Sequence, residues 1–502
     1  PDEFLVGTVT RLHDSKGNSY LVDAAQAVLR ERPKTRFYLF GEGPLRPELE
    51  AQAKALGLGD RFVFGGFTRD VARTVSAFDI SVFPSLWEGT PLTVFEALAM
   101  GKAIVATDAD TGIVASQGGR YFGFVTGGSL PAALAADWLA SAWDQCAAFA
   151  VMSPAAIVIE ETAGRWVAEL LGIPATASFA FTTGCQMAHV TCLAAARRHV
   201  LAAHGWDVAE HGLAGGPAIR IVAGAQRHVT LDRALRLLGF GRTAIVNVAA
   251  DDQGRMRVHA LHETLDRLEP PLIVCAQAGE VNTGAFDDLD AIAAAARAAN
   301  AWLHVDGAFG LWAAGSTSLA PLPRGHERAD SWALDGHKWL NVPYDCGIAF
   351  CAHPHSHRAA LGVQAAYFVL DSDRGREPVD WTPESSRRAR AVPVYAAIRQ
   401  LGRAGVAGLV DRCCAHARSP RAGGAARVPG SQRGRPQSGA RPFRGRRSHA
   451  PRARRGASGE AWMGGTTWDG RAAIRVSVSG WRTTEEDVAR TVAAFGRAAA
   501  GA

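Results

Sequence analysis

The chain has 502 residues, of which 48% are hydrophobic and 20% are charged. This length exceeds one ordinary core, so we expect two or three domains, and the composition excludes a disordered or collagen-like chain. Residues 412–459 hold 13 Arg and no Asp or Glu, and subtracting those charges from the net +6 leaves −7. The positive net charge therefore does not indicate nucleic-acid binding by the folded part. No apolar run reaches membrane-spanning length, so we also expect no membrane partner.

Residues 1–108 alternate short apolar segments with helical patterns. The predicted buried strands read FLVGTV, RFYLFGEG, RFVFGG, ISVFPS and AIVATD. Strands that alternate with helices in this way are typical of a parallel α/β layout. The pattern breaks between Asp108 and Gly118, and a second α/β unit is predicted to begin near Tyr121.

The second unit has its own series of predicted strands, which read AIRIVAG, TAIVNVAA, PLIVCAQAG and AWLHVDGA. A last strand, AAIRVSVSG, precedes a helix that the capping pattern TTEEDV opens. Between these parts, residues 412–459 contain no Leu or Ile and cannot bury enough surface to fold alone. Two interpretations stay open: a real basic disordered insertion, or a stretch (about 418–456) translated in the wrong frame, because GC-rich DNA read out of register gives this composition.

Lysine is rare in this chain. There are five Lys, at positions 16, 34, 54, 102 and 338, against 49 Arg. Arg serves equally well for surface charge, but a guanidinium cannot form the imine that an ε-amine forms. The solitary Lys338 therefore indicates amine chemistry.

Two further residues place Lys338 in a chemical context. Asp306 ends the predicted strand WLHVD, where the carboxyl edge of an α/β sheet binds ligands. His228 follows the predicted strand AIRIVAG and could stack on a cofactor ring. Pyridoxal phosphate (PLP) needs one lysine amine and one carboxylate against its pyridine nitrogen, because the protonated ring acts as an electron sink. Taken alone, Asp306 could equally be a strand-end cap and His228 a satisfied core histidine.

The motifs TTGCQMAH, QRHVTLDRA, GEVNTGAFD, HVDGAFG, ADSWALDGHKW and PYDCG occur here in one order. This series resembles the group II PLP-dependent amino-acid decarboxylases over roughly residues 118–490. The resemblance implies that Lys338 is the Schiff-base lysine, Asp306 the pyridinium partner and His228 the stacking imidazole. It further implies that His337 contacts the phosphate and that Ala308 contacts the ring.

The same resemblance implies several less central contacts. Cys185 and Gln186 open a helix where the family's backbone amides hold the phosphate, a task for which helix N-termini are suited. Asn282 and Asp335 are expected near further cofactor atoms, and Phe124 in the substrate pocket. The implied reaction is that of a carboxy-lyase acting on an L-amino acid, in a homodimer if the chain folds.

Three features depart from the family pattern. The phosphate segment TTGCQMAH is bulkier than usual, and the N-terminal helical arm that builds the dimer is missing. The segment DSDRGREPVDWTPE contains no Tyr, whereas a loop Tyr thought to protonate the carbanion occurs in many members. Oxidative deamination, transamination or another PLP reaction therefore stays open as an alternative to decarboxylation.

Residues 1–108 carry a second resemblance. VTRLHDSKG, GEGPLRPELE and PSLWEGTPLTVFEALAMGKAIVATD resemble the nucleotide-sugar-binding half of retaining two-domain glycosyltransferases. The resemblance implies that Glu88 and Glu96 contact the donor sugar and ribose, and that Arg11 and Lys16 neutralise the diphosphate. Because the acceptor domain is absent, this half could bind a nucleotide sugar but not transfer it alone.

The predicted fold class is α/β with three parts. A partial Rossmann-like nucleotide-sugar-binding half domain (1–112) precedes a PLP fold-type-I, aspartate-aminotransferase-like large domain (118–395). A damaged small α+β domain (396–502) follows. We expect a cytoplasmic protein, because the eight Cys show no CxxC pairs or secreted-scaffold spacing. No metal site is expected: the histidines of HPHSH (353–357) are assigned to a solvated loop, since no carboxylate or Cys pattern completes a ligand set.

Overall fold

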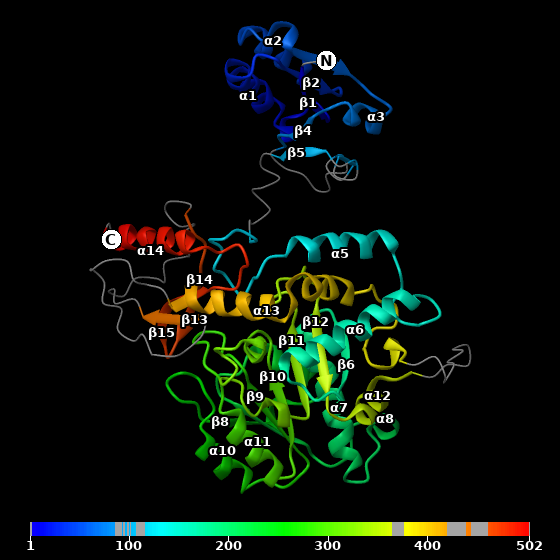
Figure 1. Cartoon of the computed structure of the whole chain (residues 1–502), viewed down its shortest axis with the longest axis vertical. Helices are drawn as coiled ribbons and strands as arrows, with labels where there is room; N and C mark the ends of the chain where they lie inside the picture. Colours follow the sequence, from blue (N-terminus) through cyan, green and yellow to red (C-terminus); the bar gives the residue numbers. More distant parts are fainter. Residues whose placement is uncertain are drawn as a thin grey trace. The chain divides into compact units, whose positions relative to one another are not determined.

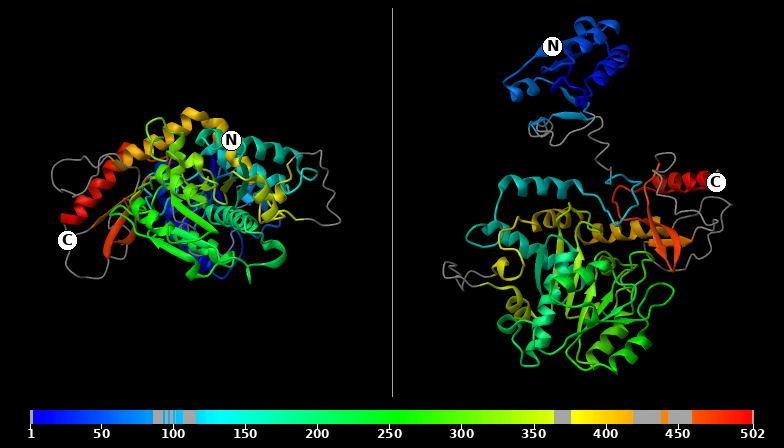
Figure 2. Two further views of the ribbon diagram at one scale, coloured as in Figure 1. Left: turned by 90° about the horizontal axis from the view of Figure 1, so that it is seen from below. Right: turned by 180° about the vertical axis from the view of Figure 1, so that it is seen from behind.

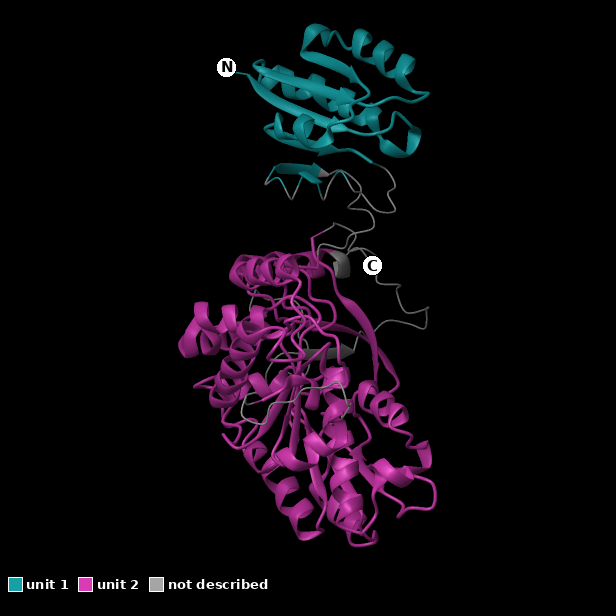
Figure 3. Ribbon diagram, turned by 90° about the vertical axis from the view of Figure 1, so that its right-hand side faces the viewer, with its two compact units in different colours: residues 1–115 teal, residues 116–502 magenta. Residues whose placement is uncertain are grey.

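The computed structural model describes residues 3–85, 93, 96–97, 100, 102–106, 116–363, 376–418, 438–442 and 460–500. The chain divides into two units, residues 1–115 and 116–502 (Figure 3). This division falls in the stretch where the strand pattern of the sequence breaks.

The apolar segments of the first unit form a five-stranded parallel sheet in the order β3-β2-β1-β4-β5 (Figure 1). The strands are β1 Phe4–Val9, β2 Thr35–Phe40, β3 Phe62–Gly66, β4 Ile80–Phe83 and β5 Ala103–Ala106. The helices are α1 Asn18–Glu31, α2 Arg46–Ala55 and α3 Val71–Ser76. All five predicted strands are thus confirmed. The strand order reverses between β1 and β4, where a doubly wound sheet opens a crevice at the carboxyl ends of its strands.

The second unit is built on a seven-stranded sheet in the order β6-β12-β11-β10-β9-β7-β8. Its strands are β6 Ser178–Thr182, β7 Arg220–Gly224, β8 Ile245–Val248, β9 Leu272–Gln277, β10 Trp302–Asp306, β11 Ser331–Asp335 and β12 Gly347–Cys351. Strand β12 is antiparallel to both of its neighbours, and the other pairs are parallel. The four strands that the sequence predicted between residues 218 and 308 are confirmed as β7, β8, β9 and β10.

Both faces of this sheet are covered, as the apolar composition of its strands requires. In β9, Val274 and Ala276 belong to one apolar cluster, whereas Ile273 and Cys275 belong to another on the opposite face. Successive side chains of a strand point to opposite faces, so an all-apolar strand needs a covering layer on each side. This double burial makes the sheet a rigid platform for its carboxyl edge.

Helices supply the two covering layers and the outer shell. They are α5 Pro131–Trp143, α6 Pro154–Leu171, α7 Cys185–Ala202, α8 Val208–His211, α9 Val229–Leu237, α10 Val258–Leu265, α11 Leu289–Ala298 and α12 Pro354–Leu361. Proline stands in the first turn of α5, α6 and α12, where its missing N–H has no helical partner to lose. Helix α13, Ala391–Arg418, packs on α5 and α6 (Figures 1 and 2) and kinks at Gly402, whose φ is 60°.

The C-terminal part differs in two respects from the prediction for residues 412–459. Helix α13 continues to Arg418 and buries Cys413 and Cys414, so the predicted boundary at 412 is too early. Strand β13, Ser438–Pro442, also lies inside this stretch and pairs with β15, Arg471–Ser477, which in turn pairs with β14, Gly464–Trp468. Residues 419–437 and 443–459 lie outside the described residues. Helix α14, Glu485–Ala500, follows the predicted capping pattern.

The predicted loop at HPHSH is wrong, because Pro354–Leu361 form helix α12. His357 is fully buried, where its Nδ1 lies 2.9 Å from Ser178 Oγ and its Nε2 lies 3.0 Å from the carbonyl oxygen of Trp381. His353 Nε2 lies 2.7 Å from Asp330 Oδ1. These histidines therefore join α12 to its neighbours.

None of the described helices is both long and apolar enough to span a membrane.

Candidate functional site

Lys338 follows directly after strand β11, in a turn that the local sequence makes tight. The strand SWALD is buried along its whole length and ends at Asp335. A Cβ at Gly336 would lie 2.6 Å from Cys346 Sγ, so only glycine fits there. The turn brings the Lys338 ammonium nitrogen to 2.9 Å from Asp335 Oδ2.

Asp335 is the centre of a group of predicted site residues. Its Oδ1 accepts the backbone N–H of Cys185 at 2.6 Å and lies 3.6 Å from His337 Nε2. Its backbone N–H donates to the carbonyl oxygen of Ala308 at 3.0 Å. Burial disfavours the ammonium of Lys338, but the Asp335 carboxylate outweighs it and raises the pKa of this lysine above its ordinary value. The structure thus places an amine, a carboxylate and a helix N-terminus at one sheet edge.

Asp306 lies on the neighbouring strand, at the end of β10. It is 8% exposed, and its Oδ1 accepts the N–H of Ala308 at 3.1 Å. Its Oδ2 lies 3.5 Å from His189 Nε2. Burial works against the charged carboxylate, but His189, with help from His228 and Lys338, holds the pKa of Asp306 well below its ordinary value. Asp306 is therefore an ionised carboxylate facing the same space as Lys338.

His228 caps the N-terminus of α9. Its Nδ1 lies 2.8 Å from Thr230 Oγ1, and its backbone N–H donates to Gln277 Oε1 at 3.2 Å. Gln186 reaches the same turn, donating from Nε2 to the carbonyl oxygen of Thr230 at 3.2 Å. Burial lowers the pKa of His228, although Asp306 opposes this effect. The imidazole is thus held by its neighbours on the same side of the site as Gln186.

Two other predicted residues contact the segment from Glu460 to Trp468. Asn282 donates to Glu280 Oε1 at 2.9 Å, and its Oδ1 accepts from Thr466 Oγ1 at 2.9 Å, so it joins β14 to the loop after β9. Phe124 is 63% exposed, with its ring centroid 5.8 Å from that of Trp462. Their cofactor and substrate roles stay predictions.

Sequence reasoning overlooked three buried polar residues around the site. His189 lies one helical turn after Cys185, and its Nδ1 is 2.9 Å from His304 Nε2. His304 Nδ1 in turn lies 2.9 Å from Ser331 Oγ. His189 could have been found from the sequence, because it lies four residues after Cys185 on a predicted helix. His304 and Ser331 lie on different strands, so no sequence spacing connects them to the site.

A tyrosine near the predicted loop was also overlooked. Tyr367 stands four residues before Asp371, the start of the segment described above as lacking Tyr. Residues 364–375 lie outside the described residues. The absence of a tyrosine from that segment alone therefore does not exclude decarboxylation.

The residues predicted to bind a nucleotide sugar belong to the first unit. Arg11 and Lys16 follow β1, and the carbonyl oxygen of Arg11 accepts from Asn18 Nδ2 at 3.0 Å. Glu96 is exposed and its carbonyl oxygen accepts the N–H of Met100. Glu88 lies outside the described residues. Arg11 and Lys16 therefore stand at the carboxyl end of β1, beside the point where the strand order reverses.

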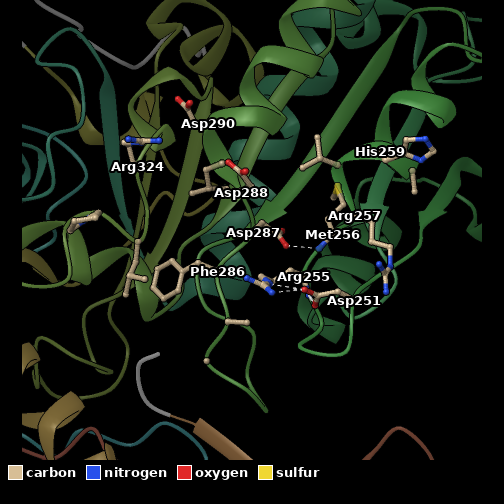
Figure 4. A pocket seen from close by; sticks show the side chains of 17 residues that line it. Asp251, Arg255, Met256, Arg257, His259, Phe286, Asp287, Asp288, Asp290 and Arg324 are labelled. Atoms are coloured by element: carbon tan, nitrogen blue, oxygen red, sulfur yellow. Dashed lines mark hydrogen bonds and ion pairs between the residues drawn. The ribbon is translucent and has the colours of Figure 1, made fainter. Parts of the chain in front are cut away.

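A separate cavity of about 1020 Å³ in the second unit is lined by acidic and basic side chains from the segments around α10 and α11 (Figure 4). Asp287 lies at its wall and accepts the N–H groups of Met256 and Gln277, each at 2.7 Å. Burial raises the pKa of Asp287 to about 6. Because Gln277 also accepts the N–H of His228, Asp287 supports the site from behind.

Comparison with known families matches two parts of the chain. Residues 106–425 match the pyridoxal-dependent decarboxylase conserved domain, and residues 3–142 match the glycosyl transferases group 1. Both resemblances inferred from the sequence are thereby confirmed. The two matches overlap at residues 106–142.

Individual relatives agree with the larger match. The chain is 31% identical over 300 residues to an aromatic-L-amino-acid decarboxylase of Bacillus atrophaeus, covering 58% of this chain and 60% of the relative. It is 33% identical over 285 residues to an L-2,4-diaminobutyrate decarboxylase of Rhizobium meliloti (strain 1021), covering 55% of each. The matches therefore span little more than half the length of these curated relatives.

Solved structures confirm the predicted PLP fold-type-I architecture. Oryza sativa TDC with PLP and tryptamine superposes with a TM-score of 0.71 at 23% identity, covering 82% of this chain and 89% of that one. Catharanthus roseus tryptophan decarboxylase in complex with L-tryptophan gives 0.69 at 17% identity, covering 91% and 98%. At such identities the likeness concerns the fold alone. The family match over residues 106–425, however, extends across both strands whose ends carry Lys338 and Asp306, and the chain belongs to the pyridoxal-dependent decarboxylase family, whose cofactor is pyridoxal phosphate.

Proposed function

We propose that residues 116–502 form a PLP-dependent carboxy-lyase for an L-amino acid, with Lys338 as the covalent anchor of the cofactor. The observation that carries this proposal is the juxtaposition of the Lys338 amine, paired with Asp335, and the ionised Asp306 at the ends of adjacent strands. An amine and a carboxylate are the two groups that PLP requires of its protein.

The residues present fit this cofactor. Asp306 is kept ionised, as a partner of a pyridinium nitrogen must be. The buried Gln186 Oε1, at the N-terminus of α7, has no hydrogen-bond partner among the described residues, but it needs a donor and a phosphate only accepts, so this atom does not itself bind the phosphate. We assign Cys185 and Gln186 to the phosphate, which a helix N-terminus favours. The N–H of Cys185 donates to Asp335 here, so its phosphate role rests on the family resemblance.

The protein's contribution to the reaction follows from these contacts. When bound, PLP supplies an electron sink for the substrate carbanion. Asp306 can hold a proton on the pyridine nitrogen, because its own pKa is far lower than that of the ring. His228, held by Thr230 and Gln277, fixes the plane of the ring, and His337 and Ala308 line the turn beside Lys338.

The choice between decarboxylation and oxidative deamination depends on how the carbanion is protonated. The segment from Asp371 that resembles the family's mobile loop contains no Tyr, so both outcomes stay open. The relatives include both outcomes by name: a tyrosine decarboxylase of Oryza sativa subsp. japonica is 31% identical and a 4-hydroxyphenylacetaldehyde synthase of Rhodiola rosea 27% identical. Assays with L-tryptophan, L-aspartate and L-2,4-diaminobutyrate that quantify CO₂, amine, aldehyde and ammonia distinguish the two reactions.

The anchor is tested by chemical fixation. Borohydride treatment of the PLP-loaded protein should attach the cofactor to the peptide that contains Lys338. Lys338→Arg should abolish the attachment, since a guanidinium keeps the charge but forms no imine. Lys102→Arg is the matched control and should label normally. Attachment at any other lysine would refute the assignment.

A second candidate function belongs to residues 1–108, which we propose bind a nucleotide diphosphate sugar without transferring it. The observation in favour is the reversal of strand order beside Arg11 and Lys16, where doubly wound sheets bind ligands. Calorimetry with uridine and guanosine diphosphates should show weak binding that Arg11→Gln reduces. Sugar transfer without a partner protein would contradict the second half of this proposal.

We further propose a homodimer in a reducing, cytoplasmic setting. Helix α5 exposes Trp138, Leu139 and Trp143, and apolar side chains grouped on one helix often mark an interface. All eight cysteines are free, as a reducing compartment would leave them. Sedimentation of the wild type and of Trp138→Ser tests the dimer; an unchanged monomer in both would exclude it.

A further inference from the structure

Three side chains next to Lys338 form a compact set of metal-binding groups. Cys185 and His189 lie one turn apart on α7, and Asp306 ends β10. Cys185 Sγ lies 3.5 Å from His189 Nε2, which lies 3.5 Å from Asp306 Oδ2, and all three ligand atoms are within 4.8 Å of one another. All three residues are less than a tenth exposed.

The spacing of these atoms agrees with the geometry of zinc. Bonds of about 2.3 Å to sulfur and about 2.1 Å to nitrogen give a tetrahedron whose edges are roughly 3.5 Å. The two measured edges have this length. Thiolate, imidazole and carboxylate together are also the donor set that favours Zn²⁺ over the harder Mg²⁺ and Ca²⁺.

The charges around the set favour a divalent cation. Asp306 and Asp335 supply two carboxylates against the single ammonium of Lys338. Metal binding displaces the thiol proton of Cys185, which leaves to solvent.

The second ring nitrogen of His189, Nδ1, is hydrogen-bonded in the way that is usual for a metal-ligating histidine. With Nε2 free to ligate, the Nδ1–H of His189 can donate to His304 Nε2 at 2.9 Å. The Nδ1–H of His304 can then donate to Ser331 Oγ at 2.9 Å, and this oxygen has a second lone pair for the Trp302 Nε1–H. Such outer hydrogen bonds orient a ligating imidazole and typically contribute about 10- to 100-fold in metal affinity.

We propose that Cys185, His189 and Asp306 bind Zn²⁺ in the PLP-free protein, and that the bound metal excludes the cofactor. The exclusion follows because both need the Asp306 carboxylate. The metal site stands on the geometry alone, whereas the exclusion rests on the proposed cofactor site.

The metal site is tested on the full chain, freed of PLP and metal, by titration with Co²⁺ as a spectroscopic probe. One equivalent should produce a thiolate-to-cobalt absorption band, which Zn²⁺ then bleaches. Cys185→Ser should remove the band, and His189→Asn should weaken binding at least about tenfold. Cys192→Ser, a buried cysteine of the same helix, is the matched control and should leave the band unchanged.

Spectroscopy on the wild type tests the metal site independently of whether the variants fold. X-ray absorption of the zinc-loaded protein should give one sulfur and at least one imidazole ligand. Absence of sulfur, or a band that survives Cys185→Ser, overturns the metal site.

The exclusion is tested by following PLP uptake through its absorbance at increasing Zn²⁺. Uptake should fall competitively and recover with a chelator; simultaneous binding of both overturns the exclusion. Failure of the metal-free protein to take up PLP would instead refute the proposed function and leave the Co²⁺ result intact.

Discussion

The ammonium nitrogen of Lys338 lies 2.9 Å from Asp335 Oδ2, while the other oxygen of that carboxylate accepts the N–H of Cys185 at 2.6 Å. One acidic side chain thus joins the reactive amine to the N-terminus of α7. Because the carboxylate raises the pKa of Lys338, its removal should lower that pKa.

We therefore predict that Asp335→Asn shifts the pH dependence of PLP attachment toward lower pH, since the amine loses its proton more readily. The measurement is the rate of attachment between pH 6 and 10 by stopped-flow absorbance. Asp345→Asn is the control; this residue is partly buried, its carboxylate lies 3.3 Å from Arg390 Nε, and its φ of 69° is one that Asn tolerates. Identical profiles for both variants and the wild type would rule out the coupling.

Asp306→Asn should retain PLP and yet lose activity by about 100-fold or more, because a neutral amide cannot hold a proton on the pyridine nitrogen. Absorbance gives the bound cofactor, and CO₂ release gives the turnover. Asp288→Asn, at the N-cap of α11 where Asn serves as well as Asp, should stay near wild type. Turnover near normal in Asp306→Asn would remove the electron-sink assignment.

A buried ion pair should contribute to the stability of the second unit. Arg387 Nη2 lies 2.7 Å from Glu160 Oε2, and both side chains are at most 1% exposed. Burial opposes the carboxylate, but the guanidinium of Arg387 keeps the pKa of Glu160 below its ordinary value. Arg387→Met should cost up to about 3–5 kcal/mol, because the buried Glu160 then keeps only Arg376, whose Nη1 lies 3.1 Å from Glu160 Oε1, as its charged partner.

The control for this pair is Arg403→Met, which removes an exposed bridge to Glu169 at 2.8 Å and should cost about 0–1 kcal/mol. Urea unfolding followed by Trp fluorescence measures both. Equal losses of unfolding free energy in Arg387→Met and Arg403→Met would show that burial does not determine how much an ion pair contributes to stability.

Asp287 should make stability fall as the pH rises between about 4 and 6. Its pKa is raised from 3.8 to about 6, so the folded state keeps a proton that the unfolded state has lost. The contribution is complete below pH 3.8 and is lost by about pH 6, with an upper bound of roughly 3 kcal/mol. The urea midpoint of the wild type should therefore fall between about pH 4 and 6, and Asp287→Asn should reduce this fall. An equal fall in the variant would show that other groups cause the pH dependence.

The frame-shift interpretation predicts that the DNA encoding residues 418–456 contains two compensating errors. Resequencing decides it, and the corrected protein should be more soluble because its apolar face regains a cover. An intact frame, together with a stable soluble product, would leave the basic insertion as the explanation.

The sequence by itself predicted most strands of the two large sheets and their order along the chain, and it singled out Lys338 as the candidate anchor. Strands such as β9 and β11 are recognisable because burial on both faces demands a continuous apolar run, which is a local property. Lys338 was predicted as the anchor because an amine cannot be replaced by the guanidinium used elsewhere in the chain.

Only the tertiary structure decided the contacts between distant residues. Arg387 and Glu160 are 227 positions apart, and His189 meets His304 across 115 positions. No periodicity records such pairs, since each residue alone resembles an ordinary helix or strand position. The structure likewise joins Asn282 to Thr466, 184 positions away, and stacks Phe124 on Trp462, contacts that only the folding of the chain creates.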